Sequence, residues 1–291
     1  MRIAAVVYVI GAILRIYGAA LAAPLAVAAY YGEWRDVAGF AVTGAATALV
    51  GHLMHRAPGR TPDDLRRPEA LAVVAFTWLI VAAASAVPYV WAGLGPIDAL
   101  FESMSGLTTT GATVFEDFGR FGRGIFFWRG LTQWLGGMGV IALFVAVLPR
   151  LAIAGRQLFF AEAPGPTDEK LTPQVRQTAM VLWRFYAGLS LLEILALVLV
   201  GMSLYDATCN TFTTLAAGGF SPHPSSIMGY ENPAAEWIIA FFMFLAGANF
   251  AVQYRALWGR PSALLKDEEF RAYAGIVFVS SLLIAFMLWR G

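Results

Sequence analysis

A run of small polar residues, Leu-Thr-Thr-Thr-Gly-Ala-Thr-Val over residues 107–114, lies between two long apolar segments. The threonine hydroxyls and the backbone carbonyls of this run supply oxygen atoms of the kind that replace the hydration shell of a cation. Gly111 lets the backbone adopt positive φ, which can turn successive carbonyls toward one axis. Unpaired backbone groups in hydrocarbon cost several kcal/mol each, so we predict that the run faces water or an ion rather than lipid.

The composition indicates an integral membrane protein. The chain is 59% hydrophobic and only 13% charged, about half the charge content of a soluble domain. Several apolar runs reach the length of about 20 residues that spans a bilayer. The single cysteine, Cys209, excludes an intrachain disulfide. The basic residues sit in loops beside apolar helices, which gives nucleic-acid binding no support. We predict an all-α membrane protein with no cofactor and no structural metal.

The apolar runs predict seven membrane spans. They cover residues 3–28, 37–54, 70–91, 125–148, 180–202, 237–257 and 273–289. A signal peptide is the alternative for the first run, but Arg15 interrupts its apolar part and favours a transmembrane helix. Two further segments, 96–107 and 203–215, have a helical pattern but are too short to cross the membrane. Each runs into a Gly-containing break, so we predict two re-entrant pore helices.

Basic residues set the orientation of this topology. Three charged loops, residues 55–69, 149–177 and 255–271, hold twelve of the twenty basic residues and lie on one side. The positive-inside rule makes that side cytoplasmic. The two Gly-containing breaks then open toward the outside.

The chain also contains an internal repeat. Asp98-Ala99 recurs 108 positions later as Asp206-Ala207, and the residues from Trp134 recur 110 positions later from Phe244. We pair Gly111 with Gly218, 107 positions later. Each unit reads helix, short helix, break, helix, and both enter from the same side, so the symmetry axis lies along the membrane normal. Such a repeat brings the breaks together at a central pathway, which is the geometry of a pore.

Two stretches, ESMSGLTTTGA over residues 102–112 and FWRGLTQWLGGMG over residues 127–139, resemble the first pore repeat of the TrkH potassium uptake proteins of the Trk/Ktr/HKT superfamily. Residues 211–221 and 243–250 resemble the second repeat. The resemblance implies a potassium-channel-like fold of tandem parallel helix–pore-helix–filter–helix repeats, preceded by two extra transmembrane helices. The expected units are residues 1–56, 68–150 and 178–258, with 270–291 as the first helix of an incomplete third repeat.

The same resemblance implies a potassium-selective permease, not an enzyme, in a bacterial-type inner (plasma) membrane. Its expected partners are the potassium ion, membrane lipid and a cytoplasmic nucleotide-binding regulatory subunit of the TrkA type. The family has four repeats and is usually dimeric, whereas only two filters occur here. The chain would therefore act as a homodimer or with a complementing C-terminal half. The alternative is a truncated, non-conducting membrane scaffold.

The candidate potassium-binding residues lie in the two breaks. They are Thr109, Thr110, Gly111 and Ala112 in the first, and Ala217, Gly218 and Gly219 in the second. In the family that this chain resembles, glycine in the filter accompanies a preference for potassium, and serine a preference for sodium. The second break has Ala216-Ala217 where the family more often has Ser-Thr, which removes two hydroxyls but keeps the carbonyls.

Three other features leave alternatives open. Arg129 either pairs with Glu102 or Asp117 or extends to the interface. The Gly136–Gly139 run either kinks an inner helix or allows close helix packing. Glu193, in the middle of a span, is either a functional acid or a packing group.

Overall fold

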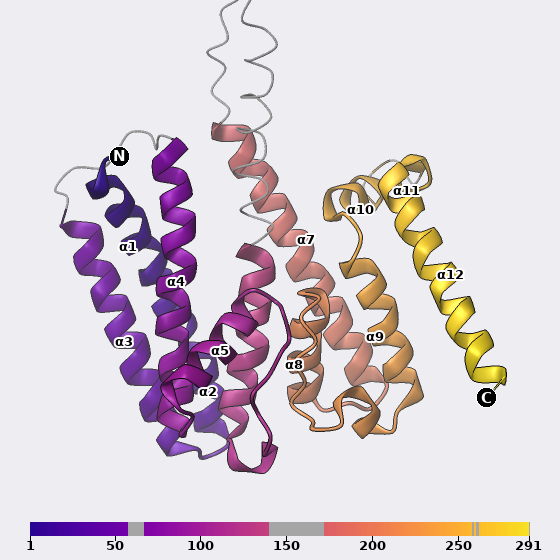
Figure 1. Ribbon diagram of the computed structural model, residues 1–291, viewed down its shortest axis with the longest axis horizontal. Helices are drawn as coiled ribbons and strands as arrows, with labels where there is room; N and C mark the ends of the chain where they lie inside the picture. Colours follow the sequence, from indigo (N-terminus) through magenta and orange to yellow (C-terminus); the bar gives the residue numbers. More distant parts are fainter. Residues whose placement is uncertain (58–66, 140–171, 258, 260–261, 291) are drawn as a thin grey trace, which may run out of the picture.

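The computed structural model describes residues 1–57, 67–139, 172–257, 259 and 262–290, and shows tilted helices standing side by side (Figure 1). The N-terminal half contains α1 (Ile3–Ala20), α2 (Ala22–Tyr30), α3 (Trp34–Arg56), α4 (Arg67–Ala92), α5 (Pro96–Leu107) and a helix over residues 123–139. The C-terminal half contains α7 (Thr172–Leu199), α8 (Leu204–Leu215), α9 (Pro233–Ala246), α10 (Phe250–Leu257), α11 (Ser262–Lys266) and α12 (Glu268–Arg290). Residues 140–148 of the predicted fourth span lie outside the described residues.

Five stretches of the described chain are long and apolar enough to cross a membrane. They are Ile3–Tyr30, Trp34–Arg56, Pro68–Ala92, Ala179–Leu199 and Glu268–Arg290. The all-helical membrane fold predicted from the sequence is therefore confirmed. The first stretch consists of two helices, α1 and α2, that meet at Leu21.

The predicted span over residues 237–257 is wrong in one respect. It is two helices, α9 and α10, bent by 104° at the break after Ala246. The side chain of Asn249 accepts a hydrogen bond from Ala251 N at 3.0 Å and starts α10. The Gln253 amide donates to Leu245 O (2.7 Å) and Ala248 O (3.0 Å), so carbonyls freed by the break keep partners.

The two short helices occur where the sequence predicts them. Proline stands at the first position of α5, where its missing N–H costs nothing. The Ser203 side chain accepts a hydrogen bond from Asp206 N at 3.1 Å and caps α8. Asp98 and Asp206 lie in the first turns of the two helices, where a carboxylate complements the helix dipole. Both short helices therefore begin for local reasons.

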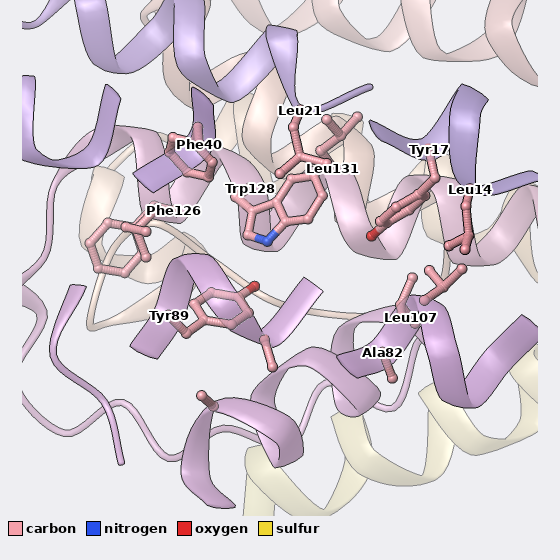
Figure 2. Packing of buried hydrophobic residues seen from close by; sticks show 14 of the residues in the cluster. Leu14, Tyr17, Leu21, Phe40, Ala82, Tyr89, Leu107, Phe126, Trp128 and Leu131 are labelled. Carbon is pink, nitrogen blue, oxygen red and sulfur yellow. The ribbon is translucent and has the colours of Figure 1, made fainter. Parts of the chain in front are cut away.

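The largest hydrophobic core joins the N-terminal helices to the helix over residues 123–139. Trp128 is fully buried there, between Tyr17 of α1 and Phe40 of α3 (Figure 2). Its indole nitrogen donates to Ser85 O of α4 at 3.2 Å. Glu33 caps the same helix by accepting from Arg123 N, at 2.6 Å, and from the next residue. The two extra N-terminal helices thus support the helix that later contacts the candidate site.

The ends of α3, α4, α7, α10 and α11 that adjoin the three charged loops lie together at one end of the molecule (top of Figure 1). The links that precede the helix over residues 123–139 and α9 lie at the opposite end. This arrangement agrees with the predicted topology. The assignment of the first end to the cytoplasm remains a prediction.

The glycines of the inner helix allow close packing, and the helix continues through them from residue 123 to 139. A Cβ at Gly136 would overlap the carbonyl oxygen of Leu107, at the end of α5. A Cβ at Gly137 would lie 3.2 Å from the backbone of Ala216, at the end of α8. The inner helix therefore approaches the C-terminal ends of both short helices.

We expect Gly136→Ala to destabilise the protein by about 1–3 kcal/mol, because the methyl group would enter a filled space. Gly188 is the matched control, since it lies in α7 with open space around its Cα. Gly188→Ala should be neutral or slightly stabilising. Thermal unfolding in detergent measures both variants, and equal melting temperatures would contradict the packing role.

Candidate functional site

The two predicted filter stretches follow α5 and α8 in the same way. We call residues 108–113 the first filter segment and residues 216–221 the second. Thr110 N donates to Ser105 O at 2.9 Å, and Gly218 N donates to Thr213 O at 2.9 Å. Each bond folds the chain back onto the last turn of its helix. Both segments are thereby tied to the C-terminal end of a short helix, which is the negative end of its dipole.

The backbone conformations of the two segments match residue by residue. Thr109 (φ 54°) corresponds to Ala217 (φ 52°), and Gly111 (φ 78°) to Gly219 (φ 79°). Positive φ is uncommon for non-glycine residues and unusual for a β-branched one such as Thr109. A strained conformation repeated at two equivalent positions indicates a functional constraint on the backbone.

This match corrects the alignment of the two filters. The sequence paired Gly111 with Gly218, but the conformations and hydrogen bonds repeat at an interval of 108. Gly111 therefore corresponds to Gly219, and Thr110 to Gly218. Gly218 has no positive φ, so its lack of a side chain needs a separate explanation.

The structure brings the two segments into contact. A Cβ at Gly111 would overlap the carbonyl oxygen of Gly218, so the backbones touch at this point. Thr110, Ala112, Ala217 and Gly219 are exposed, whereas Gly218 is buried. All seven residues predicted from the sequence thus lie in two adjoining segments, and part of their surface is open.

Two hydroxyls at the junction of α5 and the first filter segment donate hydrogen bonds to backbone carbonyls. Ser105 Oγ donates to Ala112 O at 2.6 Å and ties this carbonyl to α5. Thr108 Oγ1 donates to Met104 O at 2.7 Å. Thr108 also lies within hydrogen-bond distance of Thr110, at 2.8 Å between the two hydroxyl oxygens. These contacts fix the shape of the first segment.

Arg129 joins the outer ends of both segments. It is 2% exposed and pairs with the fully buried Glu102, with Nε and Oε1 2.7 Å apart. Of the alternatives for Arg129, pairing with Glu102 is the one observed. Its guanidinium also donates to Thr113 Oγ1 in the first segment (2.9 Å) and to Ser221 O in the second (3.3 Å). It lies over the Phe220 ring, 4.2 Å from the centroid.

The second repeat replaces the ion pair with neutral groups. Asn210 stands 108 positions after Glu102, and its amide donates to Asp206 O (2.8 Å) and to the Tyr230 hydroxyl (3.1 Å). Burial raises the pKa of Tyr230, so its hydroxyl stays protonated and donates to Asp206 at 3.2 Å. The two segments therefore have the same backbone shape but different supports.

Gln133 is a site residue that sequence reasoning missed. Its side chain is fully buried on the inner helix and accepts a hydrogen bond from Phe220 N at 3.2 Å. It lies against both filter segments, since Cβ atoms built at Gly111 and Gly218 would each approach its amide. The available signal was an amide residue within a largely apolar helix, one turn after Arg129.

Glu193 of α7 is fully buried. Its carboxylate oxygens make no hydrogen bond of ordinary geometry to the described residues, although the Thr214 side chain lies nearby and donates instead to Asn210 O. A buried polar group without a partner lowers stability. Within the described residues, the carboxyl group of Glu193 therefore lowers stability.

The fold and the site define the chain as a multi-pass helical membrane protein in which two short helices each lead into a segment of the same backbone shape. The family model of TrkH, described as a cation transport protein, matches residues 36–286. The chain belongs to this family.

The Trk system potassium uptake protein TrkH of Escherichia coli K12 is 35% identical over 296 residues, which cover 99% of this chain and 61% of that protein. TrkG of the same organism is 33% identical over 291 residues, 98% of this chain and 60% of TrkG. The crystal structure of the potassium transporter TrkH from Vibrio parahaemolyticus matches with a TM-score of 0.84 at 31% identity. The match covers 99% of this chain and 59% of that one. The chain thus spans about three fifths of these relatives.

We expect Glu102→Gln to lower the free energy of unfolding by about 3–5 kcal/mol, because Arg129 would keep a buried charge without its counter-charge. Glu116 lies in the exposed link nearby and serves as the control. Glu116→Gln should change stability by less than about 0.5 kcal/mol. Thermal unfolding in detergent compares the two, and a small effect of Glu102→Gln would contradict the importance of the ion pair.

We expect Glu193→Leu, a change of similar volume, to raise the free energy of unfolding by about 1 kcal/mol or more, because it removes a buried carboxyl group that makes no direct hydrogen bond to the described residues. Glu236→Leu is the comparison, since Glu236 is exposed in the first turn of α9 and favours the helix there. Glu236→Leu should lower stability slightly. A lower melting temperature for Glu193→Leu would show that its carboxyl group has a stabilising partner.

Proposed function

We propose that this chain supplies two of the four quadrants of a potassium-selective, channel-like permease. Potassium loses its hydration shell in the pore and is bound by oxygens of Thr109 to Ala112 and of Ala217 to Gly219. The flow is passive and gated, and it needs no cofactor.

One observation carries the proposal. The two filter segments repeat the same backbone, positive φ included, and touch between Gly111 and Gly218. Two copies in contact around one axis supply adjacent sides of an oxygen-lined ring. The ends of α5 and α8 add the negative ends of two helix dipoles, which favour a cation. The relatives named above are potassium uptake proteins, and their names agree with this choice of ion.

The remaining quadrants would come from further repeats. The Tyr186 hydroxyl of α7 donates to Trp134 O at 3.4 Å, and the Tyr273 hydroxyl of α12 donates to Phe244 O at 3.0 Å. Trp134 and Phe244 are 110 positions apart, so α12 contacts α9 at the position where α7 contacts the inner helix. This similarity supports α12 as the first helix of a third repeat.

The partners follow from the same proposal. A complementing C-terminal half or a second copy of the chain would complete the ring. The relatives are named as parts of a Trk system, which supports additional components such as a TrkA-type nucleotide-binding regulator. The charged loops would then face the cytoplasm, where that regulator binds. Rubidium flux through liposomes containing the 291-residue chain, with and without the other two repeats, tests the requirement for a complete ring. Absence of flux from the four-repeat assembly would favour the scaffold alternative.

We expect Gly111→Ser and Gly219→Ser, tested in the four-repeat assembly, to let sodium compete with rubidium uptake at about tenfold lower concentration. A side chain at these positions strains a backbone with positive φ and disturbs the carbonyl ring. Gly188→Ser on α7 is the control and should leave sodium competition unchanged. An unchanged preference for rubidium in both filter variants would contradict the proposed filter.

A further inference from the structure

We propose that the buried amide of Gln133 determines ion selectivity by holding the second filter segment against the first. The inference rests on the proposed function, because it concerns the same ring of carbonyls. Gln133 itself does not bind the ion. It is a positioning residue that acts through the backbone of the two segments.

The orientation of the amide follows from its partner. The backbone N–H of Phe220 is only a donor, so the group that faces it must be the Gln133 carbonyl oxygen, 3.2 Å away. The NH₂ group must then point in the other direction. Phe220 directly follows Gly219, so this hydrogen bond fixes the chain immediately after a residue with positive φ.

The NH₂ group lies at the junction of the two segments. A Cβ at Gly111 would lie 3.9 Å from Gln133 Nε2, and the same Cβ would overlap the Gly218 carbonyl. Nε2 has no hydrogen-bond partner among the described residues, although Gln133 is fully buried. A buried donor without a partner is rare in folded proteins. Its place between the two segments indicates a role at the filter rather than in the hydrophobic core.

The same contact explains why residue 218 is glycine. Its φ is not positive, and its counterpart in the first segment is Thr110, so the backbone shape does not require glycine there. However, a Cβ at Gly218 would lie 2.5 Å from Oε1 and 2.6 Å from Nε2 of Gln133. Gly218 therefore lets the amide approach the second segment, and the two residues form one steric unit.

Two substitutions at Gln133 should change the selectivity of the filter. Replacing Gln133 with leucine leaves the Phe220 N–H without an acceptor and frees the second segment to move. Replacing it with glutamate keeps an acceptor for Phe220, removes both N–H donors and places a negative charge behind the carbonyls. Both changes alter the spacing or the field of the ring, which are the properties that distinguish potassium from sodium.

The first experiment measures rubidium uptake and its competition by sodium in the four-repeat assembly carrying Gln133→Leu or Gln133→Glu. Sodium should compete at about fivefold lower concentration in each variant, the factor that one hydrogen bond is typically worth. Gln253→Leu is the matched control, since Gln253 is also buried and also bonds backbone groups, but at the α9–α10 break. It should lower stability without changing sodium competition. Wild-type sodium competition in both Gln133 variants would overturn the proposal.

The second experiment tests the steric unit by compensation. Gly218→Ala should strongly reduce the melting temperature in the wild-type background, because the methyl group would meet the Gln133 amide. In a Gln133→Ser background the same change should be tolerated, since the shorter side chain leaves room. Equal effects of Gly218→Ala in both backgrounds would overturn the proposal. This measurement needs no transport. If the wild-type assembly took up no rubidium, the proposed function and the selectivity role would fail, and the melting temperatures would still decide the steric pairing.

Discussion

Two helices, α5 and α8, end at the buried residues Leu107 and Leu215, inside a bundle of helices that are long and apolar enough to span a membrane. Their last turns leave backbone groups that need partners. The left-handed residues Thr109 and Ala217 turn the chain so that the following N–H groups reach back to Ser105 O and Thr213 O. Turning the chain back in this way leaves other backbone groups of the segments facing an open surface. The strained turn gives some backbone groups a protein partner and leaves the others exposed. Inside a membrane-spanning bundle, those other groups must face water or an ion, which explains why a strained turn and an oxygen-lined segment occur together.

One face of the inner helix supplies partners and space for the two filter segments. Arg129, Gln133, Gly136 and Gly137 recur at the spacing of helical turns and so lie along one side of the helix over residues 123–139. Arg129 donates hydrogen bonds to both segments, and Gln133 accepts one from Phe220 N. The two glycines leave room for the ends of α5 and α8. The helix over residues 123–139 thus contacts both filter segments, and the N-terminal core around Trp128 fixes its position.

The sequence predicts the elements of this arrangement better than their exact correspondence. The bounds of α5 follow from proline at its start and the polar run at its end, and residues 204–215 follow from the repeat. The pairing of Gly111 with Gly218 was wrong because residues 218 and 219 are both glycine, so residue identity could not choose between them, whereas the positive φ marks Gly219. The bend after Ala246 was missed because hydropathy records the length of an apolar run and not its direction. Gln133 was missed because a single neutral amide gives little signal until its partner, distant in sequence, is known.

The two described repeats also argue against a fourfold ring with identical supports. The outer end of the first segment depends on a buried ion pair, while Asn210 and Tyr230 support the second repeat through hydrogen bonds and without an Arg–Glu pair. On the 110-residue interval that relates Trp134 to Phe244, the counterpart of Gln133 is Met243, which is 58% exposed on α9. A thioether accepts hydrogen bonds only weakly. Gln133 accepts the hydrogen bond from Phe220 N in the second segment. A third segment packed against α9 would therefore need another acceptor for the equivalent backbone N–H. The backbone of the filter segments can be close to symmetric while different side chains hold each junction between quadrants. A substitution at one junction is then expected to have an effect that the matching substitution at the next junction does not have.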